Sequence, residues 1–371
     1  MTPPRRDMAS PVAAEWARSR PRAAAPRPPT ALVLGDPAPH LARALEDSRL
    51  TVTRWHRLLE PGQLCTPWPP PGPFGEAWAR MPRSSLEAAM LLHAAAARVA
   101  NGAQVHLFGA NDEGIRSAAR HFPAGTEDSR AVLIKRRCRV LVATRRSRPP
   151  RPDGLDSWEI RAPVDWGAGE RDWTFYPGVF ACGRLDPATA LLIDRLPEVP
   201  AGARILDFGA GTGPVAAAAL ERGGGGAAAV LLEPDAISLA AAARNVPGCT
   251  MVPGNAVSAA TGPFDLVVSN PPIHAGRGQS LRTVEALARG APGVLAPGGT
   301  VVLVAQRRLP VARLLESAVG DVRTAGDRGP FRVWEARGPR GSPAPLRRAP
   351  RRNAGSGVTG RRPGQPYRPS M

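Results

Sequence analysis

The stretch ARILDFGAGTG, residues 203–213, decides the fold class of this chain. Its first half is an apolar run typical of a buried strand, and its second half places glycine at alternate positions. Glycine permits positive φ and lets the backbone approach a ligand closely. The run PVAAAALERG, residues 214–223, continues as a helix with Pro214 in its first turn, where proline is tolerated. A strand, a glycine turn and a helix in this order predict a Rossmann-like nucleotide-binding unit.

Strands and helices alternate on both sides of this stretch, which favours a parallel sheet with helices on its faces. One such segment runs from about residue 31 to 143 and a second from about residue 155 to 337. We therefore predict an α/β protein with two tandem Rossmann-like domains, each with a mostly parallel sheet flanked by helices. FGAND, residues 108–112, offers one glycine where the second domain offers three, so only the second domain has a nucleotide turn. The first segment is expected to hold strands at 31–36, 51–55, 104–112 and 138–144 and helices at 84–100 and 113–122, and the second to hold further strands at 228–235, 264–270, 298–306 and 331–337.

Composition sets the expected domain boundaries. Residues 145–154 are basic, rich in proline and without periodicity, which is typical of a linker. Residues 338–371 hold eight Arg and no acid, residues 1–29 hold six Arg against two acids, and both ends have few large apolar residues. We expect a disordered basic tail at 1–29, an N-terminal domain at 30–144, a linker at 145–156, a catalytic domain at 157–337 and a disordered tail at 338–371.

The net charge of +18 allows two interpretations. Arginine-rich segments suit nucleic-acid backbones, because they attract phosphates and displace counterions. A GC-rich genome would also give 48 Arg and one Lys without selection for binding, and for the tails both interpretations stay open. KRRCR (135–139) together with RRSR (145–148) is predicted to follow RNA phosphates toward the second domain, with a solvated surface run as the alternative.

Several function classes are disfavoured by the sequence. The four cysteines, Cys65, Cys138, Cys182 and Cys249, have neither metal-pair nor redox spacing, and the six histidines do not cluster with them, so we expect no metal site. Lone thiols fit a reducing cytoplasm. No apolar run approaches membrane length and the N-terminus does not resemble a signal peptide, so a cytoplasmic protein without a membrane partner is expected.

The spacing of the nucleotide turn distinguishes between two cofactor chemistries. A dinucleotide fingerprint reads G-x-G-x-x-G, whereas Asp207, Gly209, Gly211 and Gly213 read D-x-G-x-G-x-G. This pattern favours S-adenosylmethionine (AdoMet), which has no phosphate to be held and an ammonium group that suits an acid at the end of a strand. Glu233 ends the next strand, about 20 residues on, where an acid can hold the two ribose hydroxyls. GNAV (254–257) supplies Asn255 for the adenine edge, with an ordinary turn residue as the equal alternative.

The motif NPPIHAG, residues 270–276, follows the strand-forming run FDLVVS. Each proline fixes its own φ and disfavours helix in the residue before it, so a rigid turn with free carbonyls is expected. An exocyclic amine on a base is a poor nucleophile because its lone pair is delocalised. The Asn270 side-chain oxygen and the Pro271 carbonyl can accept its two hydrogens and turn the lone pair toward a methyl donor. A proline-terminated strand is the less favoured interpretation, given the glycine turn upstream.

These motifs resemble the class I AdoMet-dependent methyltransferases that carry an Asn-Pro-Pro motif. More narrowly, residues 31–337 resemble the RsmC-type ribosomal RNA guanine-N2 methyltransferases. The resemblance rests on TFYPGVFACGRLDPATALLI (174–193), NPPIHAG, LVAQRRLPVARLLE (303–316), FRVWEAR and, in the first half, MPRSSLEAAMLLHAAAA and LFGANDEGIRSA. It implies a flipped guanine of ribosomal RNA, most simply of the small subunit, as substrate. It also implies a duplicated methyltransferase fold whose first copy is degenerate and binds RNA.

The resemblance completes the list of predicted site residues. Ile273 stands where the family has Phe, and Ala188-Thr189-Ala190 replaces a Gly-Ser-Gln-like stretch. Because Ile cannot stack on a base, an adenine amine or a protein glutamine amide stays open as acceptor, as does a non-catalytic RNA-binding or ribosome-assembly role. The protein is expected to be a monomer whose partner is ribosomal RNA or a ribosomal subunit. Predicted cofactor-binding residues are Phe180, Asp186, Asp207, Gly209, Ala210, Gly211, Gly213, Glu233, Pro234, Asn255 and Ala256; predicted acceptor-site residues are Asn270, Pro271, Pro272, Ile273 and His274.

Overall fold

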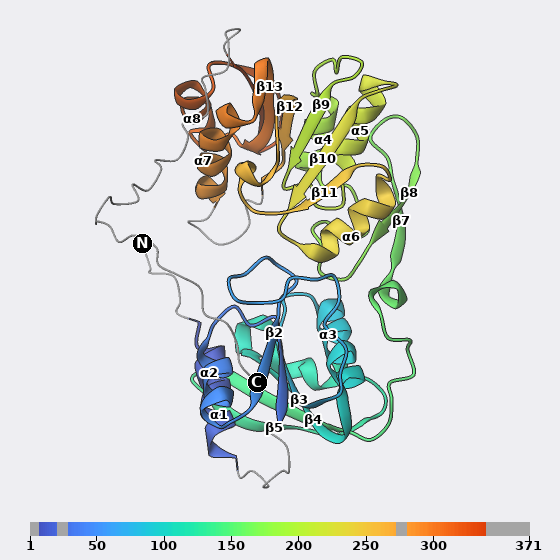
Figure 1. Ribbon diagram of the computed structural model, residues 1–371, viewed down its shortest axis with the longest axis vertical. Helices are drawn as coiled ribbons and strands as arrows, with labels where there is room; N and C mark the ends of the chain where they lie inside the picture. Colours follow the sequence, from blue (N-terminus) through green and yellow to red (C-terminus); the bar gives the residue numbers. More distant parts are fainter. Residues whose placement is uncertain (1–6, 21–28, 272–279, 339–371) are drawn as a thin grey trace, which may run out of the picture.

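The computed structural model describes residues 7–20, 29–271 and 280–338, which form two α/β domains (Figure 1). The N-terminal domain extends to residue 145, and the segment 146–154 leads to the second domain, which keeps the name catalytic domain from the prediction above. Each domain is built on one sheet, with six strands in the first and seven in the second among the described residues. The prediction of two tandem α/β domains is confirmed.

The catalytic sheet has the strand order β11-β10-β9-β12-β13-β15-β14. The first five strands are parallel, and β15 runs antiparallel to both of its neighbours. A separate hairpin, β7-β8, precedes this sheet. The elements are β7 (Ile160–Val164), β8 (Arg171–Phe175), α4 (Pro187–Asp194), β9 (Arg204–Phe208), α5 (Pro214–Gly223), β10 (Ala228–Glu233), α6 (Ala236–Asn245), β11 (Thr250–Pro253), β12 (Phe264–Ser269), α7 (Ser280–Gly290), β13 (Leu295–Gln306), α8 (Val311–Ala318), β14 (Asp321–Arg328) and β15 (Phe331–Arg337), with short 3₁₀ helices at Leu155–Trp158, Val257–Ala259 and Ala291–Gly293.

Alternating side chains of the central strands bury both faces of this sheet. On β9, Ile205 packs into a core shared with α4 and α5, and Leu206 packs into a core shared with α7 and α8. A parallel sheet covered on both faces needs such a continuous apolar run. The apolar half of ARILDFGAGTG therefore forms the centre of the catalytic domain.

The N-terminal sheet repeats the same arrangement without the outermost strand. Its order is β2-β1-β3-β4-β6-β5, with β1, β2, β3 and β4 parallel and β6 antiparallel to its neighbours. Strand for strand this matches the catalytic sheet, but no described strand takes the place of β11. The elements are α1 (Ala9–Ser19), β1 (Thr30–Leu34), α2 (His40–Asp47), β2 (Thr51–Trp55), β3 (Phe74–Arg80), α3 (Ser85–Arg98), β4 (Val99–Ala110), β5 (Thr126–Lys135) and β6 (Cys138–Arg145), with 3₁₀ helices at Asn111–Glu113 and Ile115–His121.

The strand order shows that the counterpart of the nucleotide turn in the N-terminal domain does not lie at FGAND, where it was predicted. FGAND spans the end of β4, which corresponds to β13, whereas the counterpart of the glycine turn is Gly35-Asp36 after β1. Asp36 is buried and accepts a hydrogen bond from Ser10 Oγ at 2.7 Å. The same hydroxyl accepts from the Leu41 backbone N–H at the start of α2. A side chain of α1 therefore occupies this turn.

The expectation of a disordered tail at 1–29 is wrong for residues 9–19, which form α1. Ala9, Val12, Ala13 and Ala17 bury one face of this helix against the N-terminal sheet and α2. Alanine is not a large apolar residue, but it permits close helix packing. A count of large apolar residues therefore did not predict this helix. The other tail residues, 1–6, 21–28 and 339–371, lie outside the described residues.

Several other helices and strands, many of them in less apolar segments, were not predicted from the sequence. Strands β3, β5, β11 and β14, the β7-β8 hairpin and helices α2, α4 and α8 were not predicted. Residues 115–121 form a 3₁₀ helix where an α-helix was expected. Polar side chains dominate β5 and β14, which lie at sheet edges. Edge strands of this kind lack the apolar pattern by which strands are recognised.

The two basic groups of the N-terminal domain do not form one path. KRRCR lies at the turn between β5 and β6, and RRSR lies at the other end of β6. Arg146 is paired with Glu127 and Asp128 at 3.4 and 3.3 Å, and Lys135 is paired with Glu15. The two groups are therefore separated by the length of β6, and their predicted contact with RNA phosphates stays a prediction.

Within the described ranges, no helix is long and apolar enough to cross a membrane. The same residues contain no group of three or more His, Cys, Asp or Glu side chains arranged to hold a metal ion.

Candidate functional site

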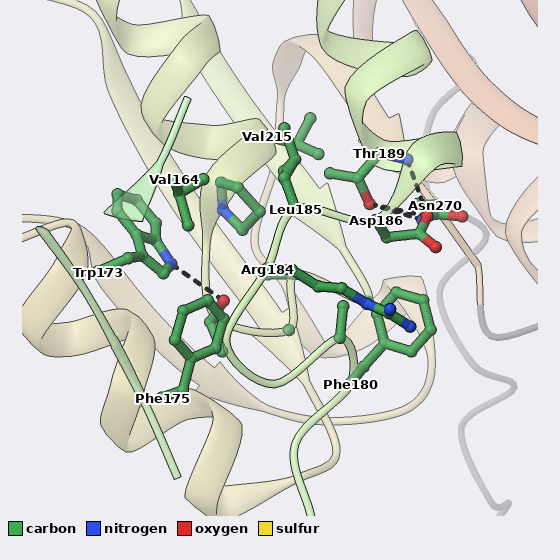
Figure 2. A pocket seen from close by; sticks show the side chains of 16 residues that line it. Val164, Trp173, Phe175, Phe180, Arg184, Leu185, Asp186, Thr189, Val215 and Asn270 are labelled. Carbon is green, nitrogen blue, oxygen red and sulfur yellow. Dashed lines mark hydrogen bonds between the residues drawn. The ribbon is translucent and has the colours of Figure 1, made fainter. Parts of the chain in front are cut away.

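A cavity of about 620 Å³ opens at the carboxyl ends of β9, β10 and β12. Parallel strands bring the residues that follow them to one edge of the sheet, and ligands of open α/β sheets bind there. A smaller pocket adjoins it beneath the segment 180–186 (Figure 2). Gly209, Gly211, Phe180, Asp186 and Asn270 line both, so the glycine turn and the Asn-Pro-Pro motif face a common space.

The glycine turn needs glycine for two different reasons. Gly209, Gly211 and Gly213 have φ of +74°, +56° and +92°, a conformation that side chains disfavour. A Cβ on Gly211 would point into open space, whereas one on Gly213 would lie 2.8 Å from a Val246 methyl. Gly211 thus leaves room on the cavity side, and Gly213 permits close packing of α5 against α6 and β10. Ala210 also lines the smaller pocket.

Asp207 has a different position from the one expected. Its side chain is 1% exposed, lines neither cavity, and accepts a hydrogen bond from the Ala216 backbone N–H at 3.1 Å. Burial raises its pKa to about 7. Asp207 therefore fixes the turn to the first residues of α5 from beneath, rather than presenting its carboxylate to a ligand's ammonium group.

Glu233, unlike Asp207, lines the larger cavity. Its Oε2 accepts from the Gly211 backbone N–H and its Oε1 from the Asp235 N–H, both at 3.0 Å. These bonds hold the acid between the glycine turn and the start of α6. Burial, with the charge of Asp235 as a further cause, raises the pKa of Glu233 to about 7. An acceptor so placed fits the predicted role of binding the ribose hydroxyls of AdoMet.

The raised pKa of Glu233 predicts pH-dependent cofactor binding. Hydroxyl donors favour the ionised carboxylate, so binding should release a proton when Glu233 is protonated beforehand. The dissociation constant of S-adenosylhomocysteine should rise about tenfold between pH 8 and pH 6, which isothermal titration calorimetry can measure. The Glu233→Gln variant should bind more weakly at pH 8 and show little change with pH. Equal slopes for the two proteins would rule out this role for Glu233.

Asn270 is held at the cavity by its amide nitrogen (Figure 2). Nδ2 donates to Thr189 Oγ1 at 2.8 Å and lies 3.3 Å from Asp186 Oδ2. An ionised carboxylate can only accept hydrogen bonds, so the amide must direct its NH₂ group toward Asp186. With its NH₂ group turned toward Asp186 and Thr189, Asn270 has an orientation compatible with the predicted role of its side-chain oxygen, and that role stays a prediction.

Asp186 and Thr189 hold Asn270 from α4. Asp186 is the N-cap of that helix and accepts from the backbone N–H groups of Ala188 and Thr189 at 2.9 and 3.0 Å. Asp186 was predicted as a cofactor ligand, and its contacts are with α4 and Asn270. Thr189 was not among the predicted site residues. Its hydroxyl contacts a residue 81 positions away, which no local pattern reveals.

The remaining predicted residues divide into three groups. Phe180 is 53% exposed at the rim of both cavities, and Pro234, Asn255 and Pro271 line the larger one. Ala256 is exposed and lines neither cavity. Pro272, Ile273 and His274 lie outside the described residues. Two residues of the N-terminal domain that the sequence did not single out, Leu58 and Arg83, complete the wall of the larger cavity.

The chain is similar in sequence to several ribosomal RNA methyltransferases. The family model for the methyltransferase small domain matches residues 172–335. Ribosomal RNA small subunit methyltransferase C of Pseudomonas putida (strain W619) is 34% identical over 272 residues, which are 72% of this chain and 80% of that protein. The protein of the same name from Hahella chejuensis is 29% identical over 276 residues, 69% of this chain and 75% of that protein.

A solved structure shares the whole arrangement of both domains. It is the 16S rRNA N2 G1207 methyltransferase (RsmC) of T. thermophilus, in complex with AdoMet and guanosine. The likeness has a TM-score of 0.75 and covers 90% of this chain and 92% of that one, with 23% sequence identity. At this identity the match supports the fold.

Proposed function

The chain belongs to the family of ribosomal RNA small subunit methyltransferase C, and from this premise we propose that it methylates the exocyclic N2 amine of a guanine in small-subunit ribosomal RNA. The observation that carries the proposal is the orientation of Asn270, whose amide nitrogen is bound by Asp186 and Thr189. Its oxygen is left for the amine of the acceptor. The larger cavity has room for a methyl donor and a base together.

The chain's own residues orient the acceptor and require no strong base. When bound, AdoMet supplies the electrophilic methyl group and S-adenosylhomocysteine is left as the product. The Asn270 oxygen and the Pro271 carbonyl accept the two hydrogens of the amine, which directs the nitrogen lone pair toward the methyl donor. The hydrogen bonds also stabilise the positive charge that develops on the nitrogen as the new N–C bond forms. The methylated nitrogen then loses one proton to water.

The primary test is methyl transfer to defined RNA. Tritiated AdoMet, unmodified small subunits and naked 16S rRNA should give N2-methylguanosine, identified by nucleoside mass spectrometry. Methyladenosine, or label in protein, would replace the guanine assignment with one of the other acceptors. Binding of the cofactor without transfer to any of them would favour a non-catalytic RNA-binding role. We also propose a cytoplasmic monomer that needs no metal, so activity should survive EDTA and light scattering should give a mass of 39.0 kDa.

Arg83 is proposed to contact a phosphate beside the target base. It lies two residues before α3, is exposed, lines the larger cavity, and within the described part of the chain forms no ion pair. Arg83→Gln should raise the KM for RNA about fivefold, the effect of one exposed ion pair, and lower the salt dependence of binding by one charge. The affinity for S-adenosylhomocysteine should not change.

Arg43→Gln is the matched control for this prediction. Arg43 lies on α2, is also exposed, and lines neither cavity. Filter binding of RNA at several salt concentrations compares the two variants. The same loss of affinity in both would mean that Arg83 has no special place at the site.

A further inference from the structure

The loop that follows β2 joins the N-terminal domain to the cofactor edge of the catalytic domain (Figure 1). The Leu59 N–H donates to the Pro234 carbonyl and the Ala236 N–H donates to the Arg57 carbonyl, both at 2.9 Å. Leu58 and Asp235 form an antiparallel bridge between these two bonds. The loop is thus paired, like a short strand, with the residues that follow Glu233.

The Arg57 side chain extends this contact into the interior. Its Nε donates to Asp235 Oδ1 at 2.9 Å and a terminal nitrogen donates to Oδ2, which is a bidentate pair. The other terminal nitrogen donates to Glu87 Oε1 at 2.9 Å and to the Pro177 carbonyl at 3.1 Å. Arg57 is 7% exposed. A planar guanidinium can make these four hydrogen bonds at once, with two of them in a fixed bidentate pair, whereas an ammonium has only three donors and no such fork.

The partners of Arg57 belong to two walls of the catalytic cavity. Asp235 continues the segment that carries Glu233 and Pro234, and Pro177 precedes Gly178 and Phe180 on another wall. Glu87 lies on α3 of the N-terminal domain, three residues after the N-cap Ser84. The Arg57 side chain therefore connects both walls of the cavity to the N-terminal domain.

The contact between Arg57 and its partners depends on the charges of Arg57, Asp235 and Glu87. Burial alone would lower the pKa of Arg57, but Asp235 and Glu87 outweigh it and raise the pKa, so the guanidinium stays charged. The charged groups that act on Glu233 are Asp235 and Arg57, and Asp207 lies close enough to be influenced by it. Arg57 favours the ionised form of Glu233, whereas Asp235 opposes it.

We propose that Arg57 of the N-terminal domain is a positioning residue for the cofactor site of the catalytic domain, so that domain docking and cofactor affinity are coupled. This inference rests on the proposed cofactor site. It assigns to the first domain a role in organising the methyl donor's pocket, in addition to the binding of RNA. By linkage, the cofactor must in turn favour the docked arrangement of the domains.

The test compares variants of the full chain by calorimetry with S-adenosylhomocysteine between pH 6 and 9. Arg57→Met should weaken binding at pH 8 by about tenfold or more, within the usual range of coupling between sites. It should also move the midpoint of the pH dependence upward, because the charge that favours ionised Glu233 is gone. At saturating cofactor, kcat should fall much less than the KM for AdoMet rises.

Glu87→Gln is the matched control, because it removes a domain-interface charge without touching the segment 233–235. Its affinity should stay within about threefold of wild type, with an unchanged midpoint. Arg57→Lys keeps the charge but loses the bidentate geometry, so it should bind the cofactor more weakly than Glu87→Gln and less weakly than Arg57→Met. It replaces the methionine variant in the test if that variant fails to fold. Equal effects of Arg57→Lys and Glu87→Gln, or an unmoved midpoint in folded Arg57→Met, would overturn the proposal. A wild type that binds no cofactor would instead refute the proposed function.

Discussion

Replacing Asn270 by alanine should lower kcat for methyl transfer by about 10²–10³-fold, the loss typical of removing one preorganised polar group that stabilises a transition state. The amide is bound on its nitrogen side by Thr189 and Asp186, so its oxygen has one orientation before any acceptor enters. No reorganisation is then needed during the reaction, which is why the loss should appear in kcat. Single-turnover transfer of tritiated methyl groups to unmodified small subunits measures it.

Two further measurements separate chemistry from binding in this variant. The affinity of Asn270→Ala for S-adenosylhomocysteine should stay within about twofold of wild type, because the ribose contacts are proposed to lie at Glu233, which is held by the Gly211 N–H and not by Asn270. Thr189→Val should show a smaller loss of kcat, since Asp186 still faces the amide nitrogen. A full wild-type kcat in Asn270→Ala would show that the Asn-Pro-Pro backbone alone orients the acceptor.

Gly213→Ala should destabilise the catalytic domain more than Gly211→Ala, because a Cβ on Gly211 would meet nothing within 4 Å. A side chain at φ +92° costs about 1–2 kcal/mol. The added Cβ would also lie 2.8 Å from Val246 and 3.2 Å from Leu231, and such overpacking costs about 1–3 kcal/mol. The free energy of unfolding should therefore fall by about 2–5 kcal/mol, as measured by urea titration followed by tryptophan fluorescence.

Gly202→Ala isolates the conformational part of this effect. Gly202 has φ +77°, and a Cβ there would meet nothing within 4 Å. Its loss should be about 1–2 kcal/mol. Trp173 is a suitable reporter, because its Nε1 donates to Thr212 Oγ1 at 3.1 Å beside the turn. If both variants lost the same stability, the contact with Val246 would be relieved without cost and the packing argument would be wrong.

The sequence predicted those parts of the site that lie in short consecutive motifs. The glycine turn, Glu233 and Asn270 each follow a strongly apolar strand, and parallel pairing of these strands brings them to one edge. The partners that orient Glu233 and Asn270 could not be predicted from the sequence. Thr189 contacts Asn270 from 81 residues away, and Arg57 contacts Asp235 from 178 residues away, so only the tertiary fold brings these pairs together.

Asp207 shows a different limit of reasoning from pattern. The D-x-G-x-G-x-G spacing singled out its position correctly, but spacing does not reveal whether a carboxylate faces a ligand or a helix N-terminus. The structure assigns it to the Ala216 N–H beneath the turn. Likewise, the alanine-rich face of α1 gave no apolar pattern, although the helix is packed tightly against the first sheet.

The hydroxyl of Ser10, bound between Asp36 and the start of α2, gives the two domains unequal dependence on metabolites. A free ligand stabilises the fold that binds it by an amount that grows with its concentration. In the first domain, the Ser10 side chain takes the place of a ligand. Because Ser10 belongs to the same polypeptide, its effective concentration does not vary. The second gains stability only when the methyl donor or its product is present. Starvation for methionine would therefore loosen the half that performs chemistry before the half proposed to hold RNA.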